Sequence, residues 1–251
     1  MDHYSKEAEL HGVSGTCTIQ DIRTRRLEFN AIRAFIRDGM RVCEVGCGNG
    51  FTAKELAKEF FISLDASDLN KDLVRLAQKN LPAKGRGSVN FSVKNVLHIN
   101  ENEKYNLVFT ERCLQNLLSW KQQQNALEKL KGALTLGGTL VLIESFVECL
   151  NNLNKARAEL DLPPISPPWY NHWFHEKKLL PFMRKIGFEY LQEENFLSGY
   201  YFGSRVLLPA LYPKNKKVQS DSQLNNFFCG FPPVGGFGPM KLVAFKKVHS
   251  L

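Results

Sequence analysis

Three glycines at every second position, Gly46, Gly48 and Gly50, constrain the fold of this chain more than any other feature. They follow residues 41–45, a predicted buried parallel strand, and precede the helix-forming run 52–58. Glycine tolerates positive φ and has no Cβ, so such a turn brings backbone N–H groups close to a ligand. A strand, a glycine turn and a helix in this order are typical of a doubly wound α/β sheet.

The spacing after the glycines indicates a nucleoside ligand. A dinucleotide fingerprint would need its third glycine at position 51, which is Phe51. Instead, a second buried strand is predicted over residues 61–64 and leads into Asp65 and Asp68. A carboxylate about 20 positions past the glycines can accept hydrogen bonds from both hydroxyls of a ribose. Either aspartate could fill this role.

Glu44, the glycine turn and the acidic end of the second strand resemble the class I S-adenosylmethionine-dependent methyltransferases, over residues 40–148. The resemblance implies S-adenosylmethionine as the cofactor. It favours Asp68 over Asp65, because the apolar residues of the next helix then fall at the family's positions. The turn residues that it places along the methionine and ribose parts of the cofactor are Gly46, Cys47, Gly48 and Gly50.

The later strand ends carry further positions of the resemblance. After the predicted strand 89–93, the family usually has an acidic residue that accepts from the adenine amino group. This chain has Asn95, followed by Val96, and the amide oxygen of asparagine can accept the same bond. Thr110 and Glu111 end the fourth predicted strand and would lie beside the reacting sulfonium. An ordinary strand exit is the alternative interpretation for both.

Residues 1–38 are predicted to form an amino-terminal lid and an amphipathic helix over 19–37. Arg25 of this helix could close over the carboxylate of the cofactor, or it could belong to an ion-pair ladder on the helix surface. Tyr4 would be part of the lid.

The whole chain, residues 1–251, is predicted to be one methyltransferase domain. Alternating strands and helices indicate a doubly wound, mostly parallel seven-stranded sheet with helices on both faces and an antiparallel last strand. Residues 40–147 form the cofactor-binding half. Segments 148–182 and 197–239 are too long and irregular to be plain connectors, so we expect them to be walls of a substrate pocket. A second small core on the sheet is the alternative.

Glycines also help to predict the boundary before the fifth strand. A helix is predicted over residues 121–134, and Gly137 with Gly138 reads as its stop signal. The fifth strand is then predicted over 139–144. A later helix is predicted over 176–186.

Methyl transfer mainly requires alignment of the acceptor and exclusion of water, because the sulfonium already activates the methyl group. A base is needed only where the acceptor is protonated at rest. The predicted candidates are His172, whose side chain titrates near neutral pH, with Tyr170 and Glu144 behind it. His172 could instead be a packed residue of an aromatic segment.

The net charge of +8 favours an anionic partner, although a basic surface could also serve solubility alone. We therefore predict methyl transfer to an O or N atom of a small, anionic metabolite. The stretch 144–174 resembles methyltransferases that act on sugars and polysaccharide precursors. A nucleic-acid methyltransferase and a non-catalytic binding protein are the alternatives. The fourth strand lacks the proline motif of enzymes that methylate exocyclic amines, since Thr110 to Cys113 contain no proline.

The remaining features of the sequence indicate a cytoplasmic enzyme without a metal. The six cysteines form no C-x-x-C pair, so we expect buried thiols in a reducing compartment and no metal site. No apolar run is long enough for a membrane span, and the first residues lack a signal-peptide core. The aromatic residues in 169–174 and 227–237 could form a homodimer face as well as a pocket wall.

Overall fold

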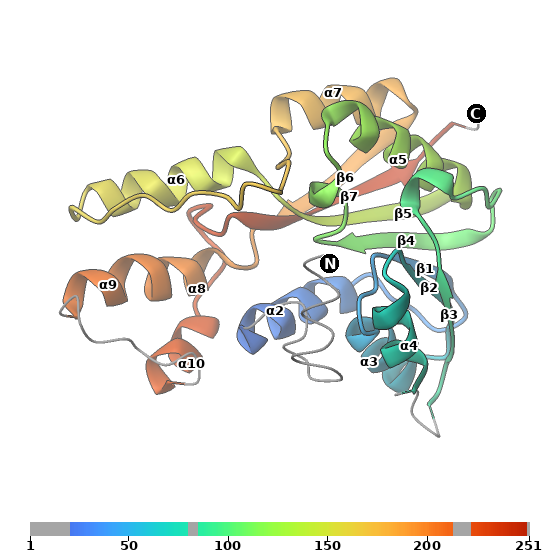
Figure 1. Cartoon of the computed structure of the whole chain (residues 1–251), viewed down its shortest axis with the longest axis horizontal. Coiled ribbons are helices and arrows are strands. Elements are labelled where there is room, and N and C mark those ends of the chain that lie inside the picture. Colours follow the sequence, from blue (N-terminus) through green and yellow to red (C-terminus); the bar gives the residue numbers. More distant parts are fainter. Residues whose placement is uncertain (1–20, 80–84, 213–221, 250–251) are drawn as a thin grey trace.

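A seven-stranded sheet forms the centre of the molecule in the computed structural model, which describes residues 21–79, 85–212 and 222–249 (Figure 1). The strand order is β3-β2-β1-β4-β5-β7-β6. Strands β1 to β5 pair in parallel, whereas β7 is antiparallel to β5 and to β6. The predicted fold class is thus confirmed. The strands are β1 (Arg41–Val45), β2 (Ser63–Asp68), β3 (Ser88–Val93), β4 (Tyr105–Glu111), β5 (Leu134–Ser145), β6 (Phe188–Glu194) and β7 (Met240–Lys247).

Helices cover both faces of the sheet because its strands direct alternate apolar side chains into two cores. In β4, Leu107 and Phe109 enter one core and Val108 enters the other. The first core includes residues of α2, α3 and α4, and the second includes residues of α5 and α7 (Figure 1). These helices are α2 (Ile22–Arg33), α3 (Phe51–Glu59), α4 (Lys71–Lys79), α5 (Trp120–Ala133) and α7 (Glu176–Lys185). Of the described helices, none has both the length and the apolar character needed to cross a bilayer.

The amino-terminal helix is shorter than predicted. It was expected over residues 19–37, whereas α2 begins at Ile22 and ends at Arg33. Asp21 sets the start, because its carboxylate accepts a hydrogen bond of 3.1 Å from the backbone N–H of Arg23. Tyr4 and the rest of the predicted lid lie outside the described residues.

The two glycines after α5 lie inside a strand, so the prediction of a helix stop is wrong. Helix α5 ends at Ala133, and β5 begins at the next residue. Gly137 has a φ of 78°, and the pairing with β4 jumps by several residues between Leu134 and Thr139. A glycine at positive φ therefore allows an irregularity in β5 here. Helix stops and strand bulges both use such glycines, so the local sequence did not separate them.

Segments 148–182 and 197–239 contain more helix than predicted. The first includes most of α6 (Val147–Ala158) and the first seven residues of α7. The described part of the second includes α8 (Ser198–Phe202), the π-helical turn η3 (Gly203–Leu207), α9 (Leu208–Leu211) and α10 (Gln223–Cys229). The two segments pack together around Leu150, Leu153 and Val206. In Figure 1, α6, α8, α9 and α10 extend away from the sheet on one side. Both interpretations of these segments, as pocket walls and as a second small core on the sheet, stay predictions.

Candidate functional site

The glycine turn after β1 is packed too closely for side chains. Gly46, Gly48 and Gly50 have φ values of 85°, 53° and 75°, in the left-handed region that glycine tolerates. A Cβ on Gly46 would lie 2.5 Å from Cβ of Cys113, and one on Gly50 would lie 2.6 Å from Cζ of Phe91. The turn is therefore packed directly against the loop after β4 and against a side chain of β3.

Asp68 joins the end of β2 to this turn. Its carboxylate accepts hydrogen bonds from the backbone N–H of Gly48 at 2.9 Å and of Asn70 at 2.8 Å. Asp65 lies further back in β2, where it accepts a hydrogen bond of 2.6 Å from Lys104. Asp68 lines the cavity described below and Asp65 does not. The geometry thus supports Asp68 as the residue that faces a ligand.

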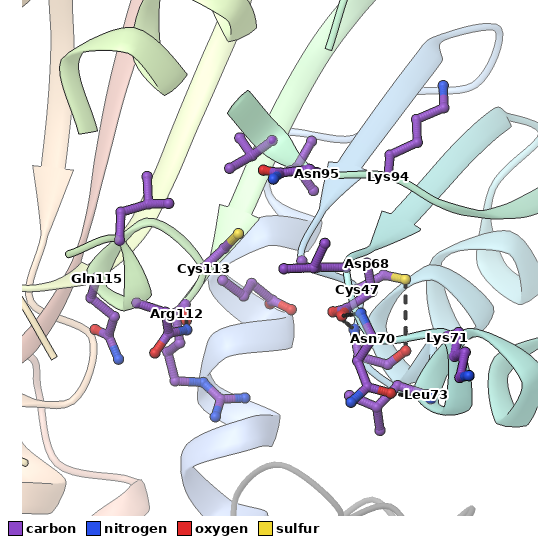
Figure 2. Close-up of a pocket in the computed structure, with 18 of the residues that line it drawn as sticks. Cys47, Asp68, Asn70, Lys71, Leu73, Lys94, Asn95, Arg112, Cys113 and Gln115 are labelled. Atoms are coloured by element: carbon purple, nitrogen blue, oxygen red, sulfur yellow. Dashed lines mark hydrogen bonds between the residues drawn. The ribbon is translucent and has the colours of Figure 1, made fainter. Parts of the chain in front are cut away.

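A cavity of about 670 Å³ opens at the carboxyl ends of β1, β2, β3 and β4 (Figure 2). Asp68, Asn70 and Lys71 lie on one side of it, and Arg112, Cys113 and Gln115 lie on the other. Ligands of open α/β sheets bind at this edge, where the strand order reverses. Here the reversal falls between β1 and β4, on either side of which β2 and β5 follow.

Nine of the predicted site residues line this cavity, and they come from parts of the chain far apart in sequence. They are Arg25, Gly46, Cys47, Gly48, Asp68, Asn95, Val96, Glu111 and Tyr170. Glu44, Gly50, Thr110, Glu144 and His172 lie outside the lining. At Asn95, the side-chain oxygen caps η1 (Val96–His98) by accepting from the backbone N–H of Leu97 at 3.0 Å. That oxygen keeps a second lone pair for a ligand.

Sequence reasoning missed most of the remaining lining residues. Two groups follow the strand ends. The first is Leu69 to Leu73 after β2, and the second, after β4, is Arg112, Cys113, Gln115, Asn116 and Leu117. Lys94 and Asn171 were also missed. The first two groups directly follow strand ends that the sequence predicts, and this position is the signal that identifies them.

Five buried or nearly buried charges lie beneath the cavity. Nε of Arg112 is 2.8 Å from Oε1 of Glu28, and Oγ1 of Thr52 donates a hydrogen bond of 2.7 Å to Oε2 of Glu111. Burial, followed by the negative charge of Glu28, raises the pKa of Glu111 to about 7. Burial and then the neighbouring Glu111 raise the pKa of Glu44 well above its usual value.

Arg25 contributes the fifth charge of this group. Its guanidinium carbon lies 5.0 Å from the centre of the Phe51 ring. Burial, and then the like charge of Arg112, lower the pKa of Arg25. Oε1 of Glu111 and Oε2 of Glu44 are buried and accept no hydrogen bond from the described residues. An orphaned buried acceptor at the cavity floor is a position where a cationic ligand group would be stabilised.

Glu144, predicted as a candidate base, organises the loop after β4. It accepts hydrogen bonds from Oγ1 of Thr110 at 2.8 Å and from the backbone N–H groups of Cys113, Leu114 and Gln115 at 2.9 to 3.1 Å. Its side chain is fully buried, and burial raises its pKa to about 7. Four donors use its oxygens, so the geometry supports a positioning role.

The predicted base His172 contributes its backbone to the same wall. Its N–H donates to the carbonyl oxygen of Gln115 at 2.7 Å, and its own carbonyl oxygen accepts from Nε2 of Gln123 at 2.7 Å. Next to it, Nδ2 of Asn171 donates to Oδ1 of Asn116 at 2.7 Å. These bonds fasten the 170–172 stretch to the loop after β4. The chemical roles of His172, Tyr170 and Glu144 remain predictions.

The described cysteines and acidic residues do not gather into a metal site. The five described cysteines are free thiols. Within residues 21–79, 85–212 and 222–249, no group of three or more metal-ligating side chains has suitable geometry.

Comparison with known proteins assigns the domain. Residues 42–138 match the family model described as the Methyltransferase domain. The chain therefore contains a methyltransferase domain, and this match supports S-adenosylmethionine-dependent methyl transfer as its activity. The match includes the glycine turn, Asp68 and β4, and with them most of the cavity lining, whereas Arg25, Tyr170 and Asn171 lie outside it.

Solved structures share the fold of this methyltransferase at low sequence identity. A methyltransferase from Methanosarcina mazei is 15% identical with a TM-score of 0.57, covering 88% of this chain and 98% of its own. A chain from the complex between the Haloferax volcanii Trm112 methyltransferase activator and a methyltransferase is 11% identical, with a TM-score of 0.65 and 99% coverage of both chains.

A third structure, the magnesium protoporphyrin IX methyltransferase of Synechocystis PCC 6803 with bound SAH, is 14% identical. Its TM-score is 0.61, and the similarity covers 97% of this chain and 92% of that one. No curated protein sequence matched the chain. At these identities the structures establish the fold, and the acceptor has to be argued from the site itself.

Proposed function

We propose that this enzyme transfers a methyl group to an O or N atom of a small molecule bound above the loop after β4. The observation that carries the proposal is the cavity at the switch point of the sheet, where Asp68 faces the glycine turn. A cavity of this volume with several polar groups converging on it suits a small polar ligand.

The residues present fit S-adenosylmethionine, which supplies a methyl group activated by a sulfonium when bound. Asp68 would accept from the ribose hydroxyls, and Asn95 with Val96 would hold the adenine. Arg25 would meet the carboxylate. The orphaned Oε1 of Glu111 would accept from the ammonium group, so the ligand would satisfy a buried acceptor that the described residues leave open.

The loop after β4 would orient the acceptor and exclude water. Glu144 and Gln123 hold this loop and the 170–172 stretch through buried hydrogen bonds, so the wall is rigid before the acceptor arrives. Tyr170, which lines the cavity, and His172 are the proposed proton acceptors for a hydroxyl or ammonium substrate.

The charge of the acceptor and the cell compartment of the enzyme are proposed from the sequence. An anionic metabolite, such as a sugar or polysaccharide precursor, is proposed from the net charge of +8. The five described free thiols support a reducing compartment such as the cytoplasm.

Calorimetry with S-adenosylhomocysteine tests the cofactor part of this function. We expect saturable binding at one site per chain, weakened in an Asp68→Ala variant. Wild-type protein that is folded and binds neither S-adenosylmethionine nor S-adenosylhomocysteine at millimolar concentration would refute the proposed function. Steep loss of RNA affinity with added salt would instead favour a nucleic-acid acceptor.

A further inference from the structure

The wall of the cavity opposite Asp68 differs from the Asp68 side in its content of charged residues. Its lining residues come from two short stretches, residues 113–118 after β4 and residues 169–174 after α6, and we name these stretches together the acceptor wall. Neither stretch contains Lys, Arg, Asp or Glu. The nearest cation of the lining, Arg112, is paired with Glu28 at 2.8 Å. Within the two stretches, His172 is the one basic side chain, so this wall offers little counter-charge to a negatively charged group.

Aromatic surface is exposed on the acceptor wall next to the cavity. Trp169 is 94% exposed and Tyr170 is 38% exposed, and their rings meet edge to face with centroids 5.7 Å apart. Tyr170 lines the cavity. Trp169 does not itself line the cavity, but its ring contacts that of Tyr170, which does. Large aromatic side chains are normally covered in a folded protein, so an exposed pair beside a cavity indicates a ligand surface.

This exposure does not come from a loosely attached segment. Phe174, five residues after Trp169, is 1% exposed and forms a bridge with Phe146. Its backbone N–H donates to the carbonyl oxygen of Ser145 at 2.9 Å. The stretch is thus anchored at its carboxyl end and at His172, and it still directs Trp169 into solvent.

Two neutral polar groups on the same wall lack partners among the described residues. Asn171 donates from Nδ2 to Asn116, but its Oδ1 accepts nothing from the described residues. Gln115 accepts at Oε1 from the backbone N–H of Ser145, at 3.1 Å, while its Nε2 donates to no described residue. One acceptor and one donor suit a hydroxyl or amine, which can both give and receive a hydrogen bond.

From this arrangement we propose that the reacting part of the acceptor is an uncharged ring with an apolar face. The ring lies against Trp169 and Tyr170, and Asn171 and Gln115 bind its hydroxyl or amine groups. This inference rests on the proposed function, because it takes the opposite side of the cavity as the cofactor side. An aromatic ring and a pyranose both have this chemistry, and any anionic group of the acceptor lies away from this wall.

Calorimetry on protein saturated with S-adenosylhomocysteine tests whether the acceptor wall binds an uncharged ring. The probes are naphthol as the aromatic ring, methyl glucoside as the neutral pyranose and glucose phosphate as the anion. The variants are Trp169→Ala and, as a matched control, Phe227→Ala, an aromatic that is 65% exposed on α10 and does not line the cavity. Circular dichroism and the affinity for S-adenosylhomocysteine confirm that each variant is folded.

We expect naphthol or methyl glucoside to bind, roughly tenfold more weakly in Trp169→Ala and within about twofold of wild type in Phe227→Ala. Glucose phosphate should bind no more tightly than methyl glucoside. The proposal is overturned if neither neutral ring binds, or if Trp169→Ala binds the ring as tightly as wild type does. It is also overturned if glucose phosphate binds about tenfold or more tightly than methyl glucoside. The proposal is also overturned if the Trp169→Ala substitution converts a dimer to a monomer and leaves ring affinity unchanged. Failure of wild-type protein to bind S-adenosylhomocysteine would instead refute the proposed function.

Discussion

Glu111 is the residue through which pH acts most directly on the cavity. Its carboxyl is buried beside Glu28 and Glu44, and its pKa is raised to about 7. A cationic ligand group needs the ionised form. Because the pKa in the free protein is raised, the ionised form is scarce below pH 7 and dominates above it.

The affinity for S-adenosylhomocysteine should therefore rise with pH. From about pH 6 to about pH 8 the ionised fraction of Glu111 grows roughly tenfold, and we expect a similar gain in affinity. Calorimetry at several pH values measures it. Glu111→Gln should bind more weakly at high pH and show a flatter profile. A wild-type affinity that falls over this range would contradict the assignment.

Asp68 has a matched control in the same strand. Asp68→Ala should weaken binding of S-adenosylhomocysteine by roughly 1–3 kcal/mol, the scale for losing hydrogen bonds to a charged group. Asp65→Ala removes a carboxylate that bonds Lys104 outside the cavity, so its affinity should stay close to that of wild type. The reverse pattern would move the ribose contact to Asp65.

A substitution at Gly46 tests how tightly the glycine turn is packed. An added methyl group would lie 2.5 Å from Cβ of Cys113, at a φ of 85° that disfavours any side chain. Gly46→Ala should lower the free energy of unfolding by about 1–3 kcal/mol and weaken cofactor binding, as urea unfolding and calorimetry would measure. Gly137→Ala also introduces strain at positive φ, but a Cβ there meets no atom within 4 Å. Its cofactor affinity should therefore be unchanged.

At the scale of single elements, the loop after β4 depends on a carboxylate from β5. Three backbone N–H groups converge on Glu144, and a carboxamide would present a donor to at least one of them. Glu144→Gln should therefore loosen η2 (Leu114–Asn116) without removing any group that lines the cavity.

Hydrogen exchange and unfolding together measure this effect. We expect Glu144→Gln to cost about 1–3 kcal/mol of stability and to speed exchange at residues 113–115. Exchange in β1 and the affinity for S-adenosylhomocysteine should change little. Unaltered exchange in the loop, with activity lost, would indicate a chemical role for Glu144 instead.

The sequence allowed prediction of those elements whose signals are local. The glycine turn, Asp68 and the mostly parallel sheet with an antiparallel last strand follow from patterns within a few residues or from the rules of parallel sheets. The bonds from Glu144 to residues 113–115 and from Gln123 to His172 join positions roughly 30 and 50 apart, and no local pattern encodes them. Helices α8 to α10 are short and rich in aromatic residues and glycine, so periodicity was weak there.

At the scale of the whole molecule, the helical segments form a packing unit beside the sheet. Leu153 is fully buried in the cluster shared by α6 and η3, and that cluster does not line the cavity. Leu153→Ala should lower the free energy of unfolding by about 2–4 kcal/mol and leave cofactor affinity unchanged. Urea unfolding and calorimetry test both parts, with the 77% exposed Leu211→Ala as the control. Lost cofactor affinity in folded Leu153→Ala would show that the cluster supports the cavity.

Strand β7 has one more consequence, for the way the protein is made. It lies between β5 and β6 and pairs with both, although it is the last of the described strands to be synthesised. A nascent chain that has not yet emerged from the ribosome beyond residue 247 leaves two sheet edges open. Such edges invite pairing with other chains, so chaperone protection would matter most in the interval between the synthesis of β6 and that of β7.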